Sequence, residues 1–282
     1  MAELLKGAAV VAAMNEKMTA EIETLKTKGI IPTLAILRVG ERADDISYEK
    51  GATKRCDTVG VAVKNVVLPA DVTQDVLMQN VEALNNDKSV HGVLIFRPLP
   101  KHLDEEAVRM ALKPEKDVDG ITNGSLAGVF TGSGEGFAPC TAQACMEILD
   151  FYNVDCKGKR AVVIGRSLVV GKPAAIMLMG KNATVTVCHT RTVDMPAVAR
   201  NAEILIVAAG SANAVTKEYL SPGQIVVDVG INMTADGKLC GDVKFDDAEP
   251  IVGAITPVPG GVGTVTTSVL VSHVVEAAKK SL

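Results

Sequence analysis

Hydrophobic residues in the first half of the chain follow two spacings, one typical of helices and one typical of buried strands. Three apolar runs predict strands, TLAILRV at 33–39, AVKNVVL at 62–68 and GVLIF at 92–96. Helical spacing predicts helices near residues 3–28, through DDISYEKGATK at 44–54, and near 73–86. The repeated order of strand, helix and strand indicates an α/β fold with parallel strand pairing.

The alternation of predicted strands and helices stops between residues 120 and 141, where GITNGSLAGVFTGSGEGFAPCT is rich in Gly and Ser. This passage is too long for an ordinary connection, so we expect a domain junction that carries site loops. Strands are predicted again in AVVIG, TVTVCH, EILIVAAG and QIVVDVG, with a helix from Lys172 and a last helix near 267–281. The predicted domains are 1–140 and 141–266, followed by a C-terminal helix at 267–282.

Composition narrows the functional classes. The 282 residues carry a net charge of −4 without a long run of Lys or Arg, so we expect no nucleic-acid partner. The chain is 48% hydrophobic and only 3% aromatic, which is typical of buried parallel strands and the helices that cover them. No stretch reaches the roughly 18 apolar residues of a membrane span. The six cysteines form no C-x-x-C pair, so we expect no metal site and a reducing, cytoplasmic location.

The stretch KRAVVIGRSLVVGKPAAIML predicts a strand, a glycine turn and a helix that opens near Pro173. Such a turn points free backbone N–H groups and the positive end of the helix dipole at an anion. Its glycines, Gly165 and Gly171, do not form G-x-G-x-x-G, and a pair of glycines alone is as often a structural turn. The following strand at dinucleotide-fold spacing favours a Rossmann domain.

The end of that second strand indicates which dinucleotide would bind. It runs into His189, Thr190 and Arg191 instead of the acidic residue that would hold a ribose 2′-OH. With Arg166 close to the glycine turn and no carboxylate to repel a 2′-phosphate, NADP is preferred to NAD. His189 alone is more often a packed or capping histidine, so it is given a minor role at most.

Several motifs together resemble one family, the bifunctional methylenetetrahydrofolate dehydrogenase/methenyltetrahydrofolate cyclohydrolase. The similarity runs along nearly the whole chain, through SY at 47–48, RPLPKH, PEKDVDGITNGSL, PCT, GRSLVVGKP, VTVCHT, VDVGIN, GDV and TPVPGGVG. The resemblance implies an N-terminal folate-binding α/β domain, a Rossmann-type NADP-binding domain, and a C-terminal helix that packs back on the first domain. It also implies a homodimer.

The resemblance implies a folate site in the first domain. Tyr48 matches a tyrosine at the folate, Pro98 and Leu99 match the substrate-binding L-P turn, and Asp119 matches the acid that holds the pterin ring. The chemistry agrees, because a pterin presents an amino group and a ring N–H side by side, and one carboxylate can accept both. In isolation, Asp-Gly is more often a turn.

The resemblance extends to the second domain. Gly260 and Gly261 match a close backbone approach to the substrate, although a plain loop explains them equally well. Arg166, Ser167 and Thr190 match positions around the NADP 2′-phosphate. Ile231 matches a residue on the nicotinamide side.

Two positions depart from the family pattern. The family has lysine four residues after the tyrosine, where this chain has Ala52, and glutamine where it has Phe96. On an ideal helix Ala52 lies about 40° round from Tyr48, and Lys54 about 120°. Lys54 either replaces the missing lysine as a catalytic residue or is a solvated surface lysine.

These departures affect two reactions unequally. Removing hydride from the N–CH2–N carbon of 5,10-methylenetetrahydrofolate mainly needs alignment with the nicotinamide, whereas hydrating the methenyl product needs positioned proton transfer. We therefore expect an NADP-dependent dehydrogenase of one-carbon metabolism with a doubtful cyclohydrolase step. The alternatives are a fully bifunctional enzyme using Lys54, a shikimate-type NADP dehydrogenase, and a regulatory dinucleotide-binding protein.

Overall fold

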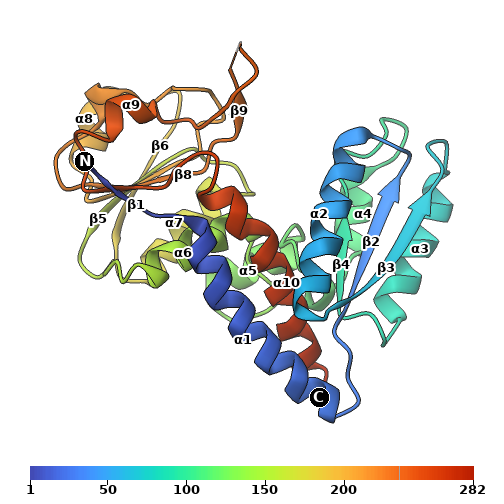
Figure 1. Ribbon diagram of the computed structural model, residues 1–282. Coiled ribbons are helices and arrows are strands. Elements are labelled where there is room, and N and C mark those ends of the chain that lie inside the picture. Colours follow the sequence, from blue (N-terminus) through green and yellow to red (C-terminus); the bar gives the residue numbers. More distant parts are fainter. Residues whose placement is uncertain (235) are drawn as a thin grey trace. The chain divides into compact units, whose positions relative to one another are not determined.

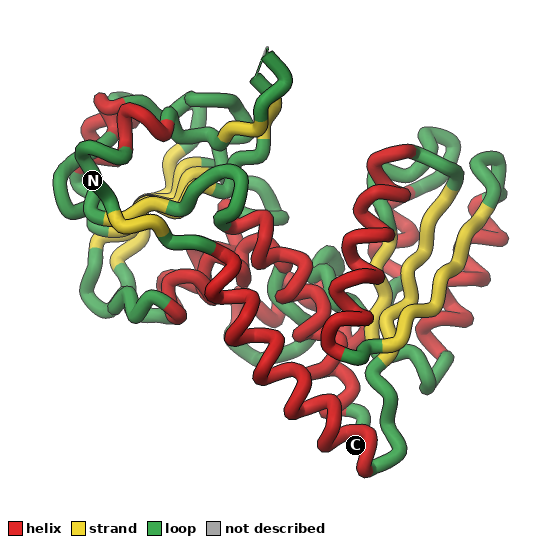
Figure 2. Tube along the Cα trace, viewed as in Figure 1, coloured by secondary structure: helices red, strands yellow, loops and turns green. Residues whose placement is uncertain are grey.

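The computed structural model describes residues 1–234 and 236–282 and divides into two compact units (Figures 1 and 2). Unit 1 comprises Met1–Ala12 and Thr141–Thr266, and unit 2 comprises Ala13–Cys140 and Thr267–Leu282. The first twelve residues, which the sequence suggested as part of the first domain, thus group with Thr141–Thr266. The boundaries fall inside helix α1 (Gly7–Thr27), at the start of α6 (Cys140–Phe151) and inside α10 (Val262–Lys280).

Unit 2 is built on a parallel sheet in the order β3-β2-β4. Strand β2 (Thr33–Val39) pairs with β3 (Ala62–Leu68) and with β4 (Gly92–Ile95), both parallel, which confirms the predicted strands and their pairing. Helix α2 (Ala43–Val59) connects β2 to β3, and α3 (Gln74–Asn86) connects β3 to β4. Figure 1 shows these two helices on opposite sides of the strands.

One face of this sheet carries a continuous apolar core. Ala35, Leu37 and Val39 of β2 pack with Leu77 and Val81 of α3, because alternate residues of a strand point to the same face. Helix α4 (Glu105–Ala111) adds to the same cluster. Both helices begin at side-chain caps, since Thr73 accepts the Val76 N–H and Asp104 accepts the Ala107 N–H.

The passage between residues 120 and 141 is less irregular than the sequence suggested. After the short helix η1 (Pro114–Lys116) it contains α5 (Asn123–Thr131), capped by Thr122, whose side chain accepts the Ser125 N–H. The helix was missed because its glycines disguise the pattern. Gly128 is required there, since a Cβ would lie 1.9 Å from the Glu135 carbonyl oxygen.

Unit 1 is built on a six-stranded parallel sheet in the order β1-β11-β8-β7-β5-β6. Its strands are β1 (Glu3–Leu4), β5 (Arg160–Ile164), β6 (Thr184–Cys188), β7 (Ile204–Val207), β8 (Ile225–Asp228) and β11 (Ala254–Ile255). The prediction of a helix from residue 3 was wrong, because Glu3 and Leu4 pair with Ala254 and Ile255 and the helix begins at Gly7. A two-residue strand leaves no periodic pattern to recognise.

Short elements complete unit 1. They are α7 (Gly171–Gly180), α8 (Met195–Arg200), η2 (Lys217–Tyr219), α9 (Phe245–Ala248), and a β9 (Asn232–Met233) to β10 (Leu239–Cys240) antiparallel pair. Helix α10 begins at Val262, five residues before the predicted start. Its first turn is made of small residues, and Gly263 lies under Ile231, where a Cβ would come within 2.9 Å of the isoleucine.

The C-terminal part of α10 belongs to unit 2, which confirms that the last helix packs with the first folded domain. His273 stacks on Phe137 with ring centroids 4.9 Å apart, and its Nδ1 lies 2.9 Å from the Val118 carbonyl oxygen. Gly92 of β4 leaves room for Val274, since a Cβ there would come within 3.0 Å of it. Across the described ranges, none of the helices has the length and apolar character needed to cross a membrane.

Candidate active site

Unit 1 has a pocket where its strand order reverses. The chain passes from β5 to β6 on one side of the sheet and from the neighbouring β7 to β8 on the other, so the connections that leave β5 and β7 run in opposite directions. In open parallel sheets this is the place where ligands bind. A cavity of about 490 Å³ lies here, lined by residues that follow the three strands, among them Gly165, Arg166, Ser167, His189, Thr190 and Ala208.

The loop after β5 is shaped by its two glycines. Gly165 has φ of 125°, and a Cβ there would lie 2.2 Å from the Ala208 carbonyl oxygen. A Cβ at Gly171 would lie 2.2 Å from the Gly165 carbonyl oxygen. Ser167 closes the loop, since its hydroxyl accepts the Val170 N–H at 3.1 Å and its carbonyl accepts the Lys172 N–H at 3.0 Å. The loop therefore holds bare backbone at the start of α7, as an anion site requires.

The chemistry of this pocket suits a phosphorylated ribose. None of the residues that line the cavity is acidic. Arg166, Ser167 and Thr190 are exposed at its rim and free to meet a ligand. His189 has another role, because its Nδ1 accepts the Arg191 backbone N–H at 3.1 Å and so shapes the turn after β6.

A smaller pocket in unit 1, of about 180 Å³, brings together three residues predicted from the resemblance. Ile231, Gly260 and Gly261 line it with Asp228. Gly260 has φ of 104°, and its carbonyl accepts the Gly7 N–H at 2.8 Å. A Cβ at Gly261 would lie 2.5 Å from the Pro257 carbonyl oxygen, so this loop also presents bare backbone.

In unit 2, Tyr48 projects from α2 and meets Phe96, the residue that follows β4. The two rings are edge to face, with centroids 5.6 Å apart and planes at 89°. The orientation of α2 is fixed by its neighbour Glu49, which pairs with Arg38 of β2 at 2.8 Å. Tyr48 remains 40% exposed, so its ring is available to a ligand.

The two lysines of the same helix lie on its solvent side. Lys50 and Lys54 are exposed, whereas Ala52 and Cys56 are completely buried. The position one turn after Tyr48 is therefore filled by a methyl group inside the packing. The Ala52 side chain points into the packed interior, whereas the Lys54 side chain, two residues later on the helix, points to solvent.

Two aspartates of the DVDG segment differ in their surroundings. Asp117 is completely buried and accepts the backbone N–H groups of Ile121 at 3.0 Å and Thr122 at 2.7 Å. Asp119 is 28% exposed, and no backbone N–H of the described residues donates to its carboxylate. Asp117 holds the loop together, whereas Asp119 is paired only through side chains, those of Arg97 and Cys140, among the described residues.

Electrostatics make Asp119 unusual. Desolvation raises the pKa of Asp119 to about 6, although the nearby Arg97 cation acts in the opposite direction. Desolvation and the Asp119 charge also raise the pKa of Tyr48, so this phenol stays protonated at neutral pH. Tyr48 is therefore suited to donate a hydrogen bond.

The turn after β4 separates the predicted Pro98 and Leu99. Pro98 is exposed, and its carbonyl accepts from Arg42 at 3.0 Å. The Leu99 side chain packs in the core beside α3 and α4, while its backbone N–H donates to Glu105 at 2.9 Å. Arg97 was not singled out from the sequence; a charged residue two positions after a fully buried strand was the signal that could have found it.

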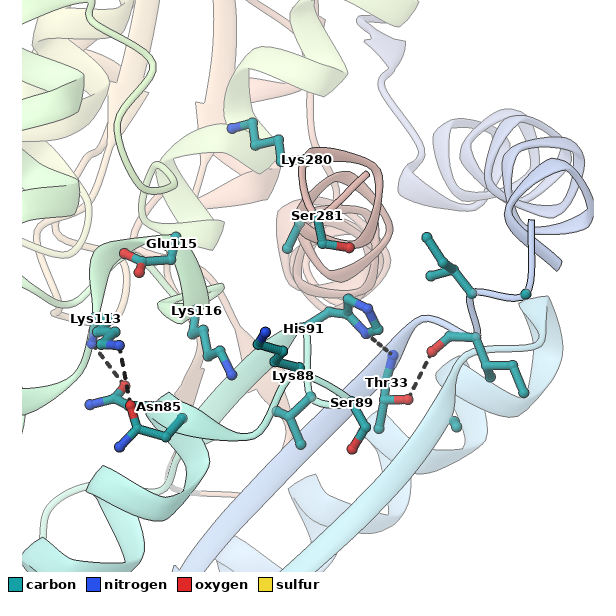
Figure 3. A pocket seen from close by; sticks show the side chains of 17 residues that line it. Thr33, Asn85, Lys88, Ser89, His91, Lys113, Glu115, Lys116, Lys280 and Ser281 are labelled. Carbon is teal, nitrogen blue, oxygen red and sulfur yellow. Dashed lines mark hydrogen bonds between the residues drawn. The ribbon is translucent and has the colours of Figure 1, made fainter.

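A further cavity of unit 2, of about 1020 Å³, lies elsewhere (Figure 3). Thr33, Ala62 and His91 line it, so it sits at the amino ends of β2, β3 and β4. It contains none of the predicted site residues. Lysines surround it, but Lys116 is already engaged, since its ammonium donates to the Leu84 carbonyl at 2.8 Å and the Asp87 carbonyl at 2.5 Å.

Comparison with known proteins gives matches over the whole chain. Residues 5–119 match the tetrahydrofolate dehydrogenase/cyclohydrolase catalytic domain, and residues 139–282 match the NAD(P)-binding domain of the same family. The bifunctional protein FolD of Carboxydothermus hydrogenoformans is 51% identical over 281 residues, covering 99% of this chain and 98% of the relative.

Solved structures of enzymes from this family are similar to this chain over its whole length. The bifunctional FolD dehydrogenase/cyclohydrolase of Campylobacter jejuni superposes with a TM-score of 0.97 at 39% identity, covering 100% of both chains. The Trypanosoma brucei FolD enzyme, solved in complex with NADP cofactor and an inhibitor, has a TM-score of 0.92 at 36% identity, covering 99% of this chain and 98% of that one. With both units matched, the chain belongs to the tetrahydrofolate dehydrogenase/cyclohydrolase family.

Proposed function

We propose that this protein oxidises 5,10-methylenetetrahydrofolate to 5,10-methenyltetrahydrofolate with NADP in one-carbon metabolism. The observation that carries the proposal is the pairing, in one family member, of a partly exposed carboxylate at Asp119 with a glycine-built anion loop at Gly165–Gly171. NADP supplies the acceptor for the hydride when it is bound.

The residues of unit 1 would hold the cofactor in two pockets. Backbone N–H groups after Gly165 would bind the pyrophosphate, while Arg166, Ser167 and Thr190 would surround the 2′-phosphate. Ile231, beside Gly260 and Gly261, would line the nicotinamide side, where a bare backbone permits close approach.

The residues of unit 2 would orient the folate. Asp119 would accept the amino group and ring N–H of the pterin, and Tyr48 would lie against the ligand with a protonated hydroxyl. Pro98 and the backbone of Leu99 would border the ring. Hydride removal is driven by the nitrogen lone pairs of the substrate, so orientation is the main contribution of these residues.

The unit 2 site lacks the polar side chains that hydrolysis of the methenyl product would need at Ala52 and Phe96. That reaction needs a group that moves protons at a positioned water. Ala52 is buried, Phe96 offers only a hydrocarbon ring to Tyr48, and Lys54 is exposed on α2. We propose that cyclohydrolase activity is weak or lost.

Product analysis with purified protein tests both parts. Wild-type protein supplied with methylenetetrahydrofolate and NADP should form NADPH and accumulate the methenyl compound instead of 10-formyltetrahydrofolate. Lys54→Ala should change neither result. Rapid formyl product formation that is lost in Lys54→Ala would instead establish a bifunctional enzyme using Lys54, and absent NADPH formation would overturn the dehydrogenase.

We infer a cytoplasmic homodimer. All six cysteines are free and five of them are buried, as suits a reducing compartment. Unit 1 exposes apolar side chains that a second copy of the chain could cover in a dimer, among them Val193, Met233 and Leu239. Sedimentation analysis of the purified protein measures the oligomeric state directly.

A further inference from the structure

Arg97 lies beside Asp119 in the candidate folate site, two residues after the end of the buried strand β4. Its guanidinium stands near two carboxylates, with Nη1 3.8 Å from Oε1 of Glu105 and Nη2 3.8 Å from Oδ2 of Asp119. These distances permit strong attraction but exceed the length of a hydrogen bond. Arg97 therefore supplies a positive charge beside Asp119 without using up the lone pairs of that carboxylate.

The donors of Arg97 are largely uncommitted. Its Nε is buried and has no hydrogen-bond partner among the described residues. Glu105 is directed by another contact, because its Oε2 accepts the Leu99 N–H at 2.9 Å. The side chain of Arg97 is 26% exposed, so it is held beside Asp119 yet remains accessible from solvent. Among the described residues, the two terminal nitrogens of Arg97 meet only the carboxylates of Glu105 and Asp119, at ion-pair distance.

The pterin ring has a complementary edge. Its amino group and ring N–H are donors, and the adjacent ring carbonyl is an acceptor. Asp119 can accept from the two donors but repels the carbonyl, whereas a guanidinium donates to such an oxygen. Building on the function proposed above, we propose that Arg97 is a specificity-determining residue that donates to the pterin C4 carbonyl and keeps the adjacent Asp119 anionic.

The charges around Asp119 support this second role. The neighbours that act on its carboxyl are Arg97 after β4, Asp117 after η1, and Cys140 at the start of α6. Tyr48 of α2 also faces it, and His273 of α10 lies 3.9 Å from the Cys140 sulfur. Of these, Arg97 is the group that favours the anion by its charge, because Asp117 opposes it and desolvation raises the Asp119 pKa.

Arg97 is also suited to binding without hydrolysis. Guanidinium keeps its proton throughout the accessible pH range, so it cannot replace a lysine of lowered pKa as a proton-transfer group. A permanent cation beside Asp119 thus fits a site that orients the folate but does not hydrate the product.

Steady-state kinetics of Arg97→Met test the proposal. The KM for methylenetetrahydrofolate should rise about tenfold to a hundredfold while kcat changes far less, because a charge-assisted hydrogen bond to bound substrate is lost. The rise in KM at low pH should also begin at a higher pH than in wild type. Arg97→Lys, which keeps the charge, should restore the pH profile but only part of the affinity.

A pair of inhibitors isolates the carbonyl contact. Wild-type protein should prefer pteroylglutamate to its 4-amino counterpart, in which an amino group replaces the carbonyl, and Arg97→Met should lose most of that preference. Lys64→Met, which removes an ion-paired cation elsewhere in unit 2, serves as the matched control and should leave both constants unchanged.

Two outcomes would overturn the inference. An unchanged inhibitor preference in Arg97→Met would exclude the carbonyl contact, and a lower thermal midpoint with an unchanged KM and pH profile would leave Arg97 a structural bridge between Glu105 and Asp119. Failure of the proposed dehydrogenase looks different, because wild-type protein itself would then form no NADPH.

Discussion

The two units place their candidate sites at the carboxyl ends of parallel strands but build them from different materials. In unit 1 the loop after β5 is shaped by backbone, since Gly165 and Gly171 admit no side chain. In unit 2 the site is made of side chains, chiefly Tyr48, Arg97 and Asp119, which come from three separate segments.

This difference is consistent with the proposal that the dehydrogenase step is retained and the cyclohydrolase step is weak or lost. A backbone site is preserved as long as the glycines and the strand remain, whatever the neighbouring side chains are. A side-chain site can lose one activity through two substitutions while the fold is unchanged. We propose that Ala52 and Phe96 have this effect in unit 2, while Gly165 and Gly171 keep the anion loop of unit 1 in place.

The largest expected effect comes from removing the free carboxylate of unit 2. Asp119→Ala should lower kcat/KM for methylenetetrahydrofolate by roughly a thousandfold, because two hydrogen bonds to an anion are lost together. NADP affinity, measured by titration calorimetry, should stay near wild type. Normal turnover in Asp119→Ala would remove this residue from the site.

Asp117 is the matched control, two residues away. Asp117→Ala leaves the Ile121 and Thr122 N–H groups without their acceptor, at a cost of roughly 2–4 kcal/mol. We expect its thermal midpoint to fall by several degrees, whereas that of Asp119→Ala should not. Equal losses of stability would contradict the division between a structural and a functional aspartate.

An intermediate effect is expected at the rim of the unit 1 loop. Arg166→Ala should weaken NADP binding by about 1.5–3 kcal/mol and NAD binding far less, because only NADP carries the 2′-phosphate. Arg160→Ala, at the opposite end of β5, removes a similar charge from an exposed pair with Glu203 and should affect neither cofactor. Equal weakening of both cofactors would reassign Arg166 to the pyrophosphate or the fold.

The smallest effect is a pH dependence confined to unit 2. In the proposed function Asp119 binds the folate in its anionic form, so the KM for folate should be constant well above pH 6 and rise as the pH falls through about 6. The Kd of NADP should not share this inflection. A folate KM that is flat between pH 5 and 8 would show that the carboxylate titrates elsewhere or does not contact the ligand.

Much of the fold could be predicted because its strands are buried and continuous. TLAILRV coincides with β2, since a long apolar run between turn residues leaves little choice of structure. AVKNVVL coincides with β3 although none of its residues is buried, because its valines favour a strand. Strand β1 could not be predicted from Glu3 and Leu4, because its conformation is imposed by pairing with a segment 250 residues away.

The site was less accessible to sequence reasoning for a related reason. The sequence does not distinguish the two aspartates of DVDG. In the structure Asp117 accepts backbone N–H groups of its own loop, whereas Asp119 does not. The role proposed for Arg97 depends on its closeness to Asp119 and Glu105, which lie on different segments of the chain. Such relationships depend on tertiary distances, which periodicity and spacing do not contain.

The pairing of β1 with β11 determines which fragments of the protein can fold as stable domains. A polypeptide of residues 141–266 would contain every residue of the dinucleotide pocket, but it would expose the edge of β11 that receives Glu3 and Leu5 through hydrogen bonds of 2.9 Å to Gly253 and Ile255. Open strand edges recruit other chains and promote aggregation. A soluble cofactor-binding fragment should therefore need residues 1–12 grafted back, for example by circular permutation, and not a simple truncation.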